Sequence, residues 1–450
     1  MNYYVLEKVM TNSANKVMNM NVNLVLEAGK VVRVTGPARI EVRKGRILLV
    51  GAIYDKGSKI IIHKLRSYAF KSLEDSEVAV FLGSGASLEE PNEGEEVIDS
   101  WIKISDDILK DSASLGKLLI IVIGPVESGK TTLSAFIANT LIRNNIKVGI
   151  IDADVGQEDI AIPTTVALAI PKDKFIWQRD LEPTEIRFVG CIAPQYCQES
   201  ILFAVKDLVD SAYARGLGAV VVNTDGWLNT HAALLHKLTL IRWLRPTHVI
   251  VLDNDVYDYL IKSLPSNIRV INAPKPVKVR ERNREERRGL RSEAYRKYFS
   301  KAKERSLDIN NIKVIYSNLI NGTALSSEDL AKILGISVDI IKDKVAFASK
   351  YLNSVNVVLS TPDRELIELL KCKKDLCITD SNDVKGLLVG ILNKDMKDVA
   401  VGIVKDIDFG KGTLKILTPW DGEISALIVG RVKLSLDTFE DNTRVGRCVL

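Results

Sequence analysis

Eight residues in the middle of the chain follow the phosphate-binding pattern G-x-x-x-x-G-K-[ST], from Gly124 to Thr131. Glycines allow backbone angles that other residues avoid, so the N–H groups of such a loop can point inward around a phosphate. In this pattern Lys130 reaches the β- and γ-phosphates, and the Thr131 hydroxyl holds Mg²⁺. We therefore expect ATP and Mg²⁺ at this P-loop, with the nucleotide bound by Gly124, Pro125, Val126, Glu127, Ser128, Gly129, Lys130, Thr131 and Thr132.

The sequence on either side of the loop provides the context that the motif requires. Residues 118–123, Leu-Leu-Ile-Ile-Val-Ile, form a short apolar run that is typical of a buried parallel strand. Residues 133–143 carry apolar side chains at helical spacing. A strand, a glycine loop and a helix thus follow one another, which makes a chance match to the pattern a weak alternative.

A second apolar run, residues 146–151, is followed by the carboxylates Asp152 and Asp154. Ligands of open parallel sheets lie at the carboxyl ends of the strands, so we expect both side chains beside the P-loop. One carboxylate can hold Mg²⁺ through water, and one can accept a proton from an attacking hydroxyl. We assign the metal to Thr131, Asp152 and Asp154, and proton acceptance to Asp154. The alternative is that one aspartate only caps the following helix.

Two further strands are expected at residues 219–222 and 247–253. The first leads into a polar turn, Asn-Thr-Asp-Gly-Trp, which ends at Trp227. An aromatic ring at the end of a strand can stack on a base, although a tryptophan taken alone is more often packed in the core. Strands that alternate with helical patterns predict a doubly wound parallel sheet, the fold of a P-loop NTPase.

A basic segment, residues 278–305, contains twelve Lys and Arg residues against five Glu, a net charge of +7 in a chain of net +5. Planar guanidinium groups suit phosphates. We predict a mobile lid whose arginines neutralise charge on a transferring γ-phosphoryl group. A solvated helical face and a contact with RNA alone are the alternatives. The arginines at helical spacing are Arg280, Arg284, Arg287, Arg288 and Arg291.

Together these motifs resemble the polyribonucleotide 5′-hydroxyl kinase family, which includes the kinase subunit of the pre-mRNA 3′-end cleavage factor and the nucleolar kinase of pre-rRNA processing. The resemblance covers the central part of the chain well and the flanks more weakly. It rests on the loop at 124–131, Asp-x-Asp-Val-Gly-Gln at 152–157, Phe188-Val189-Gly190 with Pro194, Asn-Thr-x-Gly-Trp at 223–227, and an arginine-rich segment ending at Tyr298-Phe299.

The resemblance implies ATP-dependent phosphorylation of the 5′-hydroxyl end of RNA in RNA processing or repair, with DNA left open as a second acceptor. A nuclease partner is left open as well. The family's lid follows an Arg-x-x-x-Arg pattern, which both Arg280/Arg284 and Arg284/Arg288 fit. We assign catalysis to Lys130, Asp154, Arg284 and Arg288, and nucleic-acid contacts to Gln157, Thr224, Trp227, Arg280, Arg287 and Arg291. Members often carry a hydroxyl residue between Gly190 and Pro194, where this chain has Cys191-Ile192-Ala193.

Three other functions fit parts of this pattern. A scaffold that binds ATP without transfer chemistry is disfavoured by the intact Lys130, Thr131 and Asp154. A MinD-like NTPase would carry a lysine six residues before the invariant one, where this chain has Gly124. A small-molecule kinase is disfavoured by the arginine density and by the β-rich flanks.

Sequence pattern and composition predict three parts in the chain of 450 residues and a cytoplasmic location. Alternating strands punctuated by turns predict a small antiparallel β-domain over 1–100, which ends in an acidic linker at 89–96. The kinase domain is expected over 103–345, with its lid at 278–305, and a second β-rich domain over 355–450. Five cysteines without zinc-like spacing favour a reduced, cytoplasmic setting. No apolar run reaches the ~18 residues of a membrane span.

Overall fold

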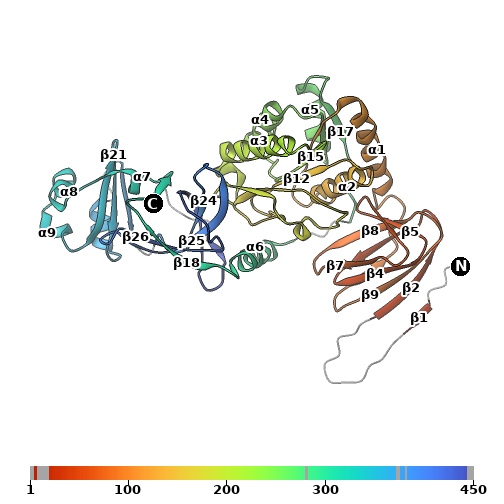
Figure 1. The fold of residues 1–450 in the computed structure, drawn as a ribbon, viewed down its shortest axis with the longest axis horizontal. Helices are drawn as coiled ribbons and strands as arrows, with labels where there is room; N and C mark the ends of the chain where they lie inside the picture. The colour runs from red at the N-terminus through yellow and green to blue at the C-terminus, as the bar shows by residue number, and fades with distance from the viewer. Residues whose placement is uncertain (1–4, 8–19, 279–281, 371–374, 381–382, 443–450) are drawn as a thin grey trace. The chain divides into compact units, whose positions relative to one another are not determined.

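The computed structural model describes residues 5–7, 20–278, 282–370, 375–380 and 383–442 (Figure 1). Its contacts divide the chain into two compact units, which are described separately below. The first unit comprises residues 1–152, 168–182 and 209–282, and the second comprises residues 153–167, 183–208 and 283–450. In the described part of the chain, no helix is long and apolar enough to cross a membrane.

The N-terminal part of the first unit consists of two antiparallel sheets, as its alternating sequence predicts. Alternate residues of β8 are buried, for example Tyr68 and Phe70, because successive side chains of a strand point to opposite faces. One sheet has the order β1 (Val5–Glu7), β2 (Met20–Leu26), β9 (Ser76–Leu82), β4 (Ala38–Lys44), β7 (Lys59–Ile62). The other has the order β10 (Ser87–Glu89), β3 (Val31–Thr35), β8 (Ser67–Ser72), β5 (Arg46–Leu49), β6 (Ala52–Asp55).

Parallel strands in the same unit position the P-loop. Neighbouring strands follow the order β12 (Val148–Ala153), β15 (Ala219–Thr224), β11 (Leu118–Ile123), β16 (His248–Val251), β17 (Arg269–Asn272). Every residue of β11, β12 and β15 is buried, which explains their uninterrupted apolar sequences. The chain passes from β11 over β15 to β12, and later from β15 over β11 to β16. Strand order therefore reverses beside β11, the place where open α/β sheets bind ligands.

Helices of the first unit accompany these strands, so the predicted α/β class is confirmed (Figure 1). α1 (Ile98–Leu115) follows the acidic linker, and its Trp101 packs edge-on against Phe136 of α2 at 5.9 Å between ring centroids. The Trp101 indole N–H also donates to the Pro274 carbonyl at 2.9 Å. The helices after the sheet strands are α2 (Lys130–Arg143), α4 (His231–Leu244) and α5 (Asn254–Ser263).

The second unit contains β14 (Glu185–Phe188), α6 (Arg284–Phe299) and two C-terminal sheets. One has the order β18 (Lys303–Asp308), β26 (Thr413–Thr418), β25 (Asp398–Asp408), β24 (Leu387–Leu392), β27 (Ala426–Leu434), β19 (Lys313–Ile315), and β28 (Asp441–Asn442) pairs with β27. The other has the order β20 (Thr323–Ala324), β21 (Val345–Tyr351), β22 (Ser354–Leu359), β23 (Leu376–Asp380). Short helices accompany them: α7 (Asn318–Asn321), α8 (Ser327–Leu334), α9 (Val338–Ile341) and α10 (Arg364–Leu370).

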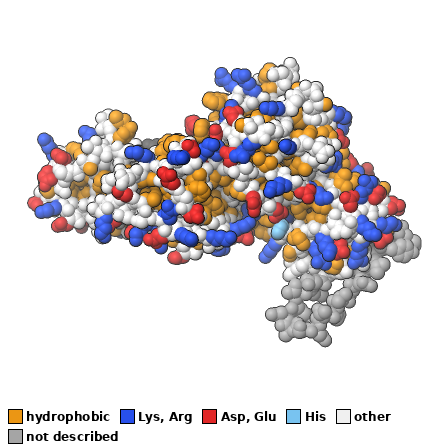
Figure 2. Space-filling view, in the orientation of Figure 1, with side chains coloured by type: hydrophobic (Ala, Val, Ile, Leu, Met, Phe, Trp, Pro, Cys, Tyr) orange, Lys and Arg blue, Asp and Glu red, His pale blue; other side chains and the backbone are white. Residues whose placement is uncertain are grey.

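The C-terminal sheet includes two strands, β18 and β19, that come earlier in the sequence than the predicted start of the C-terminal domain at residue 355. β18 pairs with β26 and β19 pairs with β27, which joins residues 303–315 to that sheet. The sequence pattern did not separate them from the middle part, because β18 is a polar edge strand with no fully buried residue. The three-part division of the chain as a whole stays a prediction. Figure 2 shows Lys and Arg interspersed with Asp and Glu on the visible face, in keeping with the small net charge.

Candidate active site

The P-loop joins β11 to α2 and requires glycine at two places. A Cβ atom at Gly124 would lie 2.6 Å from Ser128 Oγ and 3.0 Å from Leu252 Cβ, so the loop closes too tightly for a side chain there. Gly129 has φ 93°, and Glu127 also has a positive φ of 60°. The chain then enters α2, whose first N–H groups have no partner in the helix and favour an anion.

Two side chains of the loop present polar atoms that suit phosphate oxygens. The Lys130 ammonium donates to the Pro125 carbonyl at 2.7 Å, and its side chain is buried over the loop. Ser128 Oγ is also buried, and within the described residues it has no hydrogen-bond partner. A buried hydroxyl without a partner costs free energy, which a phosphate oxygen can offset. The residues present therefore fit the triphosphate of a nucleotide.

Asn223, for which the sequence pattern predicts no role, joins two of the predicted metal ligands. Its amide nitrogen donates to Asp152 Oδ1 at 3.0 Å and to Thr131 Oγ1 at 3.3 Å. Asp152 is fully buried at the end of β12, and Asn223 lies at the end of the neighbouring β15. The Asn223 amide oxygen is buried and accepts no hydrogen bond within the described part of the chain. That the two strands end side by side was the signal that could have identified Asn223.

These oxygen atoms fit Mg²⁺ rather than a transition metal. Mg²⁺ is usually held by one or two carboxylates together with substrate phosphates and water. Over the residues that the structure describes, no group of three or more His, Cys, Asp or Glu side chains is placed to hold a metal. Thr131 and Asp152 would hold the ion, with the nucleotide supplying further oxygens.

The Asn-Thr-Asp-Gly-Trp turn that follows β15 lies against the P-loop. A Cβ atom at Gly226 would lie 2.7 Å from the Val126 backbone nitrogen, so the two backbones are in contact. Asp225 holds the turn, because it accepts from the Trp227 backbone N–H at 2.9 Å and from the fully buried Lys237 ammonium at 2.5 Å. This buried ion pair was not foreseen from the sequence, since Lys237 lies in the middle of α4.

The two side chains of this turn with predicted nucleic-acid contacts have different surroundings. The Thr224 hydroxyl is buried and donates to the Val122 carbonyl at 2.8 Å, so it supports the sheet from within. The Trp227 side chain is half-buried, and its ring lies 6.2 Å from that of His236 at a tilt of 34°. Trp227 therefore has surface to offer to a ligand, whereas Thr224 has almost none.

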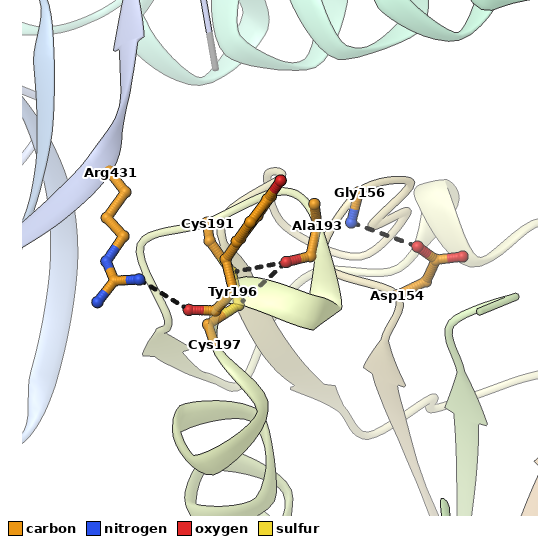
Figure 3. The surroundings of a disulfide bond; sticks show 7 residues. All are labelled: Asp154, Gly156, Cys191, Ala193, Tyr196, Cys197 and Arg431. Atoms are coloured by element: carbon orange, nitrogen blue, oxygen red, sulfur yellow. Dashed lines mark hydrogen bonds between the residues drawn. A yellow bond between two sulfur atoms is a disulfide. The ribbon is translucent and has the colours of Figure 1, made fainter. Parts of the chain in front are cut away.

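In the second unit, Asp154 closes the turn that carries Gln157. Its Oδ1 atom accepts from the backbone N–H group of Gly156 at 3.3 Å (Figure 3). The same atom accepts from the backbone N–H group of Gln157 at 3.1 Å. Asp154 and Gln157 are both half-buried. The chain continues after Asp154 into turns and bends up to β13 (Thr165–Ala169), so the aspartate caps this turn and not a helix.

The described part of the predicted lid, residues 278 and 282–305, comprises the segment leading to α6, the helix itself and the start of β18. The backbone N–H of Arg282 donates to Glu127 Oε1 of the P-loop at 2.7 Å, a contact that the sequence did not indicate. α6 begins with a capping box, in which Asn283 and Glu286 each bond the other's backbone N–H. Arg280 lies outside the described residues, so its part in the Arg-x-x-x-Arg pattern stays a prediction.

The arginines of α6 have different environments. Arg284, at the first position of the helix, is exposed, and Arg287 is half-buried. Arg288 lies 3.2 Å from Glu440 through its Nη2 atom. Arg291 binds the buried Asp441 carboxylate with two nitrogen atoms, Nη2 at 3.0 Å and Nε at 3.3 Å. Arg291 therefore has a structural partner that the charge pattern did not reveal.

Comparison with known proteins places this arrangement in a family. The model of the mRNA cleavage and polyadenylation factor CLP1 P-loop family matches residues 124–301. A polyribonucleotide 5′-hydroxyl-kinase of Methanocaldococcus jannaschii is 30% identical over 333 residues, which cover 72% of this chain and 89% of the relative. A polyribonucleotide 5′-hydroxyl-kinase of Pyrococcus furiosus is 30% identical over 67% of this chain and 82% of its own length.

A solved structure supports the fold over nearly the whole chain. Clp1p in a Clp1p–Pcf11p complex aligns with a TM-score of 0.62 at 13% identity, over 92% of this chain and 98% of Clp1p. The P-loop geometry, the family model and the similarity to the M. jannaschii protein over most of both sequences all agree. The chain belongs to the family of polyribonucleotide 5′-hydroxyl-kinases and CLP1 P-loop proteins.

Proposed function

We propose that this protein is an ATP-dependent polynucleotide 5′-hydroxyl kinase, which transfers the γ-phosphate of ATP to the 5′-hydroxyl end of RNA. The observation that carries the proposal is the joining of Thr131 and Asp152 through Asn223 beside a P-loop with an intact Lys130. The similarity to polyribonucleotide 5′-hydroxyl-kinases over most of the chain supports RNA as the acceptor.

On the nucleotide side, the P-loop backbone and Lys130 hold the phosphates of ATP. Lys130 leaves the Pro125 carbonyl for the β- and γ-phosphate oxygens, and Ser128 Oγ gains a hydrogen bond on binding. Thr131 and Asp152 would hold Mg²⁺, with Asp154 as the further ligand that the sequence predicts, and the ion would supply positive charge beside the phosphates. Asn223 fixes the Asp152 and Thr131 oxygens in place, the part that outer-sphere partners play at metal sites.

On the acceptor side, we assign Asp154 to the RNA 5′-hydroxyl, from which its carboxylate accepts the proton during attack. Gln157 and Trp227 contact the RNA, and the half-buried Trp227 ring stacks on a base. Arg284 and Arg288 neutralise charge that develops on the transferred phosphoryl group, and Arg280 and Arg287 contact the RNA backbone. For Arg288 this role requires release of the Glu440 contact, which lies at the protein surface and is therefore weak.

The wider setting follows from the same chemistry. We propose that the protein acts in RNA processing or repair in the cytoplasm, with ATP and Mg²⁺ as cofactors. DNA with a 5′-hydroxyl end is the second acceptor to compare with RNA. A nuclease that leaves 5′-hydroxyl ends is the partner whose product this activity would consume.

The alternative function is an ATP-binding scaffold in an RNA-processing complex. Incubation of purified protein with γ-labelled ATP, Mg²⁺ and matched 5′-hydroxyl RNA and DNA oligonucleotides separates the two. A kinase transfers label to the oligonucleotide, and a matched oligonucleotide that already has a 5′-phosphate stays unlabelled. ATP binding without label transfer to any oligonucleotide would favour the scaffold.

A further inference from the structure

A loop in the second unit is fastened by a disulfide bond between Cys191 and Cys197 (Figure 3). Their Cα atoms are 6.5 Å apart, within the usual range for a disulfide, and both side chains are buried. The sparse, irregularly spaced cysteines of the sequence predict reduced thiols. That expectation differs from the structure, because spacing along the chain does not show which cysteines meet in the fold.

The segment enclosed by the disulfide lies directly against the turn that carries Gln157. A Cβ atom at Gly156 would be 2.6 Å from the Ile192 carbonyl oxygen, so the two backbones touch between the cysteines and the turn. The same turn is closed by the Asp154 carboxylate through Gly156 and Gln157. The Ile192 carbonyl therefore limits how far the backbone that carries Asp154 and Gln157 can move toward this segment.

The rest of the protein holds the two ends of this segment. The Arg431 backbone N–H donates to the Gly190 carbonyl at 2.7 Å, and its guanidinium donates to the Tyr196 carbonyl at 2.9 Å (Figure 3). The backbone N–H of Gly190 donates to the Thr164 carbonyl at 3.0 Å. Between these anchors, the disulfide is the covalent constraint on residues 192–196.

We propose that the Cys191–Cys197 disulfide is a positioning element for the RNA-facing turn 154–157. The bond fixes the separation of Cys191 and Cys197. It thereby restricts the segment between them and keeps the Ile192 carbonyl against Gly156. The turn is thus ordered before RNA arrives, which spares the cost of ordering it on binding. This inference rests on the proposed function for the role of Asp154 and Gln157, whereas the bond and the bracing can be measured without any activity.

The presence of the bond is tested first, by peptide mapping of the unreduced protein. Trypsin cleaves after Arg187 and Lys206, so one peptide, 188–206, contains both cysteines and no other. Alkylation under denaturing conditions without reductant should leave this peptide unmodified, and reduction should expose both thiols. Two alkylated cysteines in the unreduced sample would overturn the proposal.

The bracing is tested with the double variants Cys191→Ala/Cys197→Ala and Cys191→Ser/Cys197→Ser. Amide hydrogen exchange across residues 154–164 should become faster in both, while exchange in the P-loop stays as in the native protein. Gln195→Ala is the matched control, because Gln195 is an exposed residue within the enclosed segment and its loss leaves the disulfide intact. Unchanged exchange at 154–164 in both double variants would overturn the proposal, whatever the protein's activity.

Kinetics then separate positioning from general loss of structure. The KM for 5′-hydroxyl RNA should rise by about three- to tenfold, the scale of ordering one loop on binding. The KM for ATP should stay unchanged. Each single Cys→Ala variant should have the same KM for RNA as the double variant, because removal of either sulfur removes the bond. An equal loss for ATP and RNA, or additive single effects, would overturn the positioning role. If native protein does not phosphorylate RNA, the proposed function fails, while the mapping and exchange results still decide the bracing.

Discussion

At the scale of single residues, Lys130 and Asp154 carry the two halves of the proposed transfer. Lys130→Ala and Asp154→Asn should each lose at least about a hundredfold in turnover, because each removes a group that acts on transition-state charge or on the proton. Lys130→Ala should also weaken ATP binding. Asp154→Asn should largely keep ATP binding, and its amide oxygen can still accept from Gly156 and Gln157.

Steady-state kinetics and an ATP-binding titration check these outcomes. Asp152→Asn is the matched comparison, since Asp152 is the other carboxylate of the motif and lies two residues earlier, within β12. If Asp154→Asn stays active while Asp152→Asn is inactive, the two carboxylates have the opposite roles.

Asn223 is the residue whose role became visible only in the structure. Asn223→Ala removes the amide that orients Asp152 Oδ1 and Thr131 Oγ1. The Mg²⁺ concentration for half-maximal activity should rise by about tenfold or more, the usual cost of losing an outer-sphere partner. A Mg²⁺ titration at saturating ATP measures this, with Asn229→Ala as the control because Asn229 is exposed. An unchanged Mg²⁺ requirement would remove Asn223 from the metal site.

At the scale of elements, helix α6 contains arginines of two kinds. Arg284 is exposed at the start of the helix, whereas Arg291 is bound to the buried carboxylate of Asp441. Arg284→Ala should lower kcat more than it raises the KM for RNA, at a cost of about 2–4 kcal/mol in transition-state stabilisation. Arg291→Ala should instead lower the free energy of unfolding by roughly 2–4 kcal/mol, because it leaves the Asp441 charge without this partner.

Kinetics at saturating RNA together with denaturant unfolding separate these effects. If Arg284 and Arg288 only grip the RNA backbone, their loss should leave kcat intact. It should also reduce the salt dependence of binding by about one unit per arginine. That result would reject the catalytic lid and retain an RNA-binding arm.

The contact between β14 and β25 gives a prediction about pH. Asp398 accepts a hydrogen bond from the Phe188 backbone N–H at 3.0 Å, and burial raises the pKa of this carboxyl group to about 6. The folded protein therefore binds this proton more tightly than the unfolded chain, in which an aspartate has a pKa of about 3.9. The contribution of Asp398 to stability is favourable at about pH 4 and is lost as the pH rises through about 6.

Asp398→Asn should remove that loss while keeping an oxygen for the Phe188 N–H. Relative to the native protein, the variant should gain up to about 2–3 kcal/mol in free energy of unfolding above pH 6. The gain should shrink toward about pH 4. Urea unfolding of both proteins across this range measures the difference. A difference that does not change with pH would contradict the raised pKa of Asp398.

At the scale of the whole molecule, the local sequence was enough to predict the elements of the nucleotide-binding site. The apolar run at 118–123, the glycines of the loop and the strand that ends beside Asp152 each specify structure over a few residues, and all three form as the pattern predicts. The position of Asp154 relative to the P-loop stays a prediction. The Asn-Thr-Asp-Gly-Trp turn also lies against the P-loop, because parallel strands end at one edge of a sheet.

Long-range contacts were beyond such reasoning. The bridge from Asn223 to Asp152, the Lys237–Asp225 pair and the Arg291–Asp441 pair join residues that the fold alone brings together. The disulfide between Cys191 and Cys197 is local in sequence, yet its residues meet only because the segment folds back. A basic run likewise cannot show which arginines are already bound by acidic side chains elsewhere in the chain.

The proposed reaction is transfer of the ATP γ-phosphate to a 5′-hydroxyl RNA end by the P-loop site. The most direct measurement is the mass of a 5′-hydroxyl RNA oligonucleotide after incubation with ATP and Mg²⁺, followed by digestion with a 5′-monophosphate-dependent exonuclease. With native protein we expect a gain of one phosphate that makes the RNA sensitive to the exonuclease, and with Lys130→Ala at least about a hundredfold less of this product in the same time. Native protein that binds ATP but leaves the RNA mass unchanged would contradict the account.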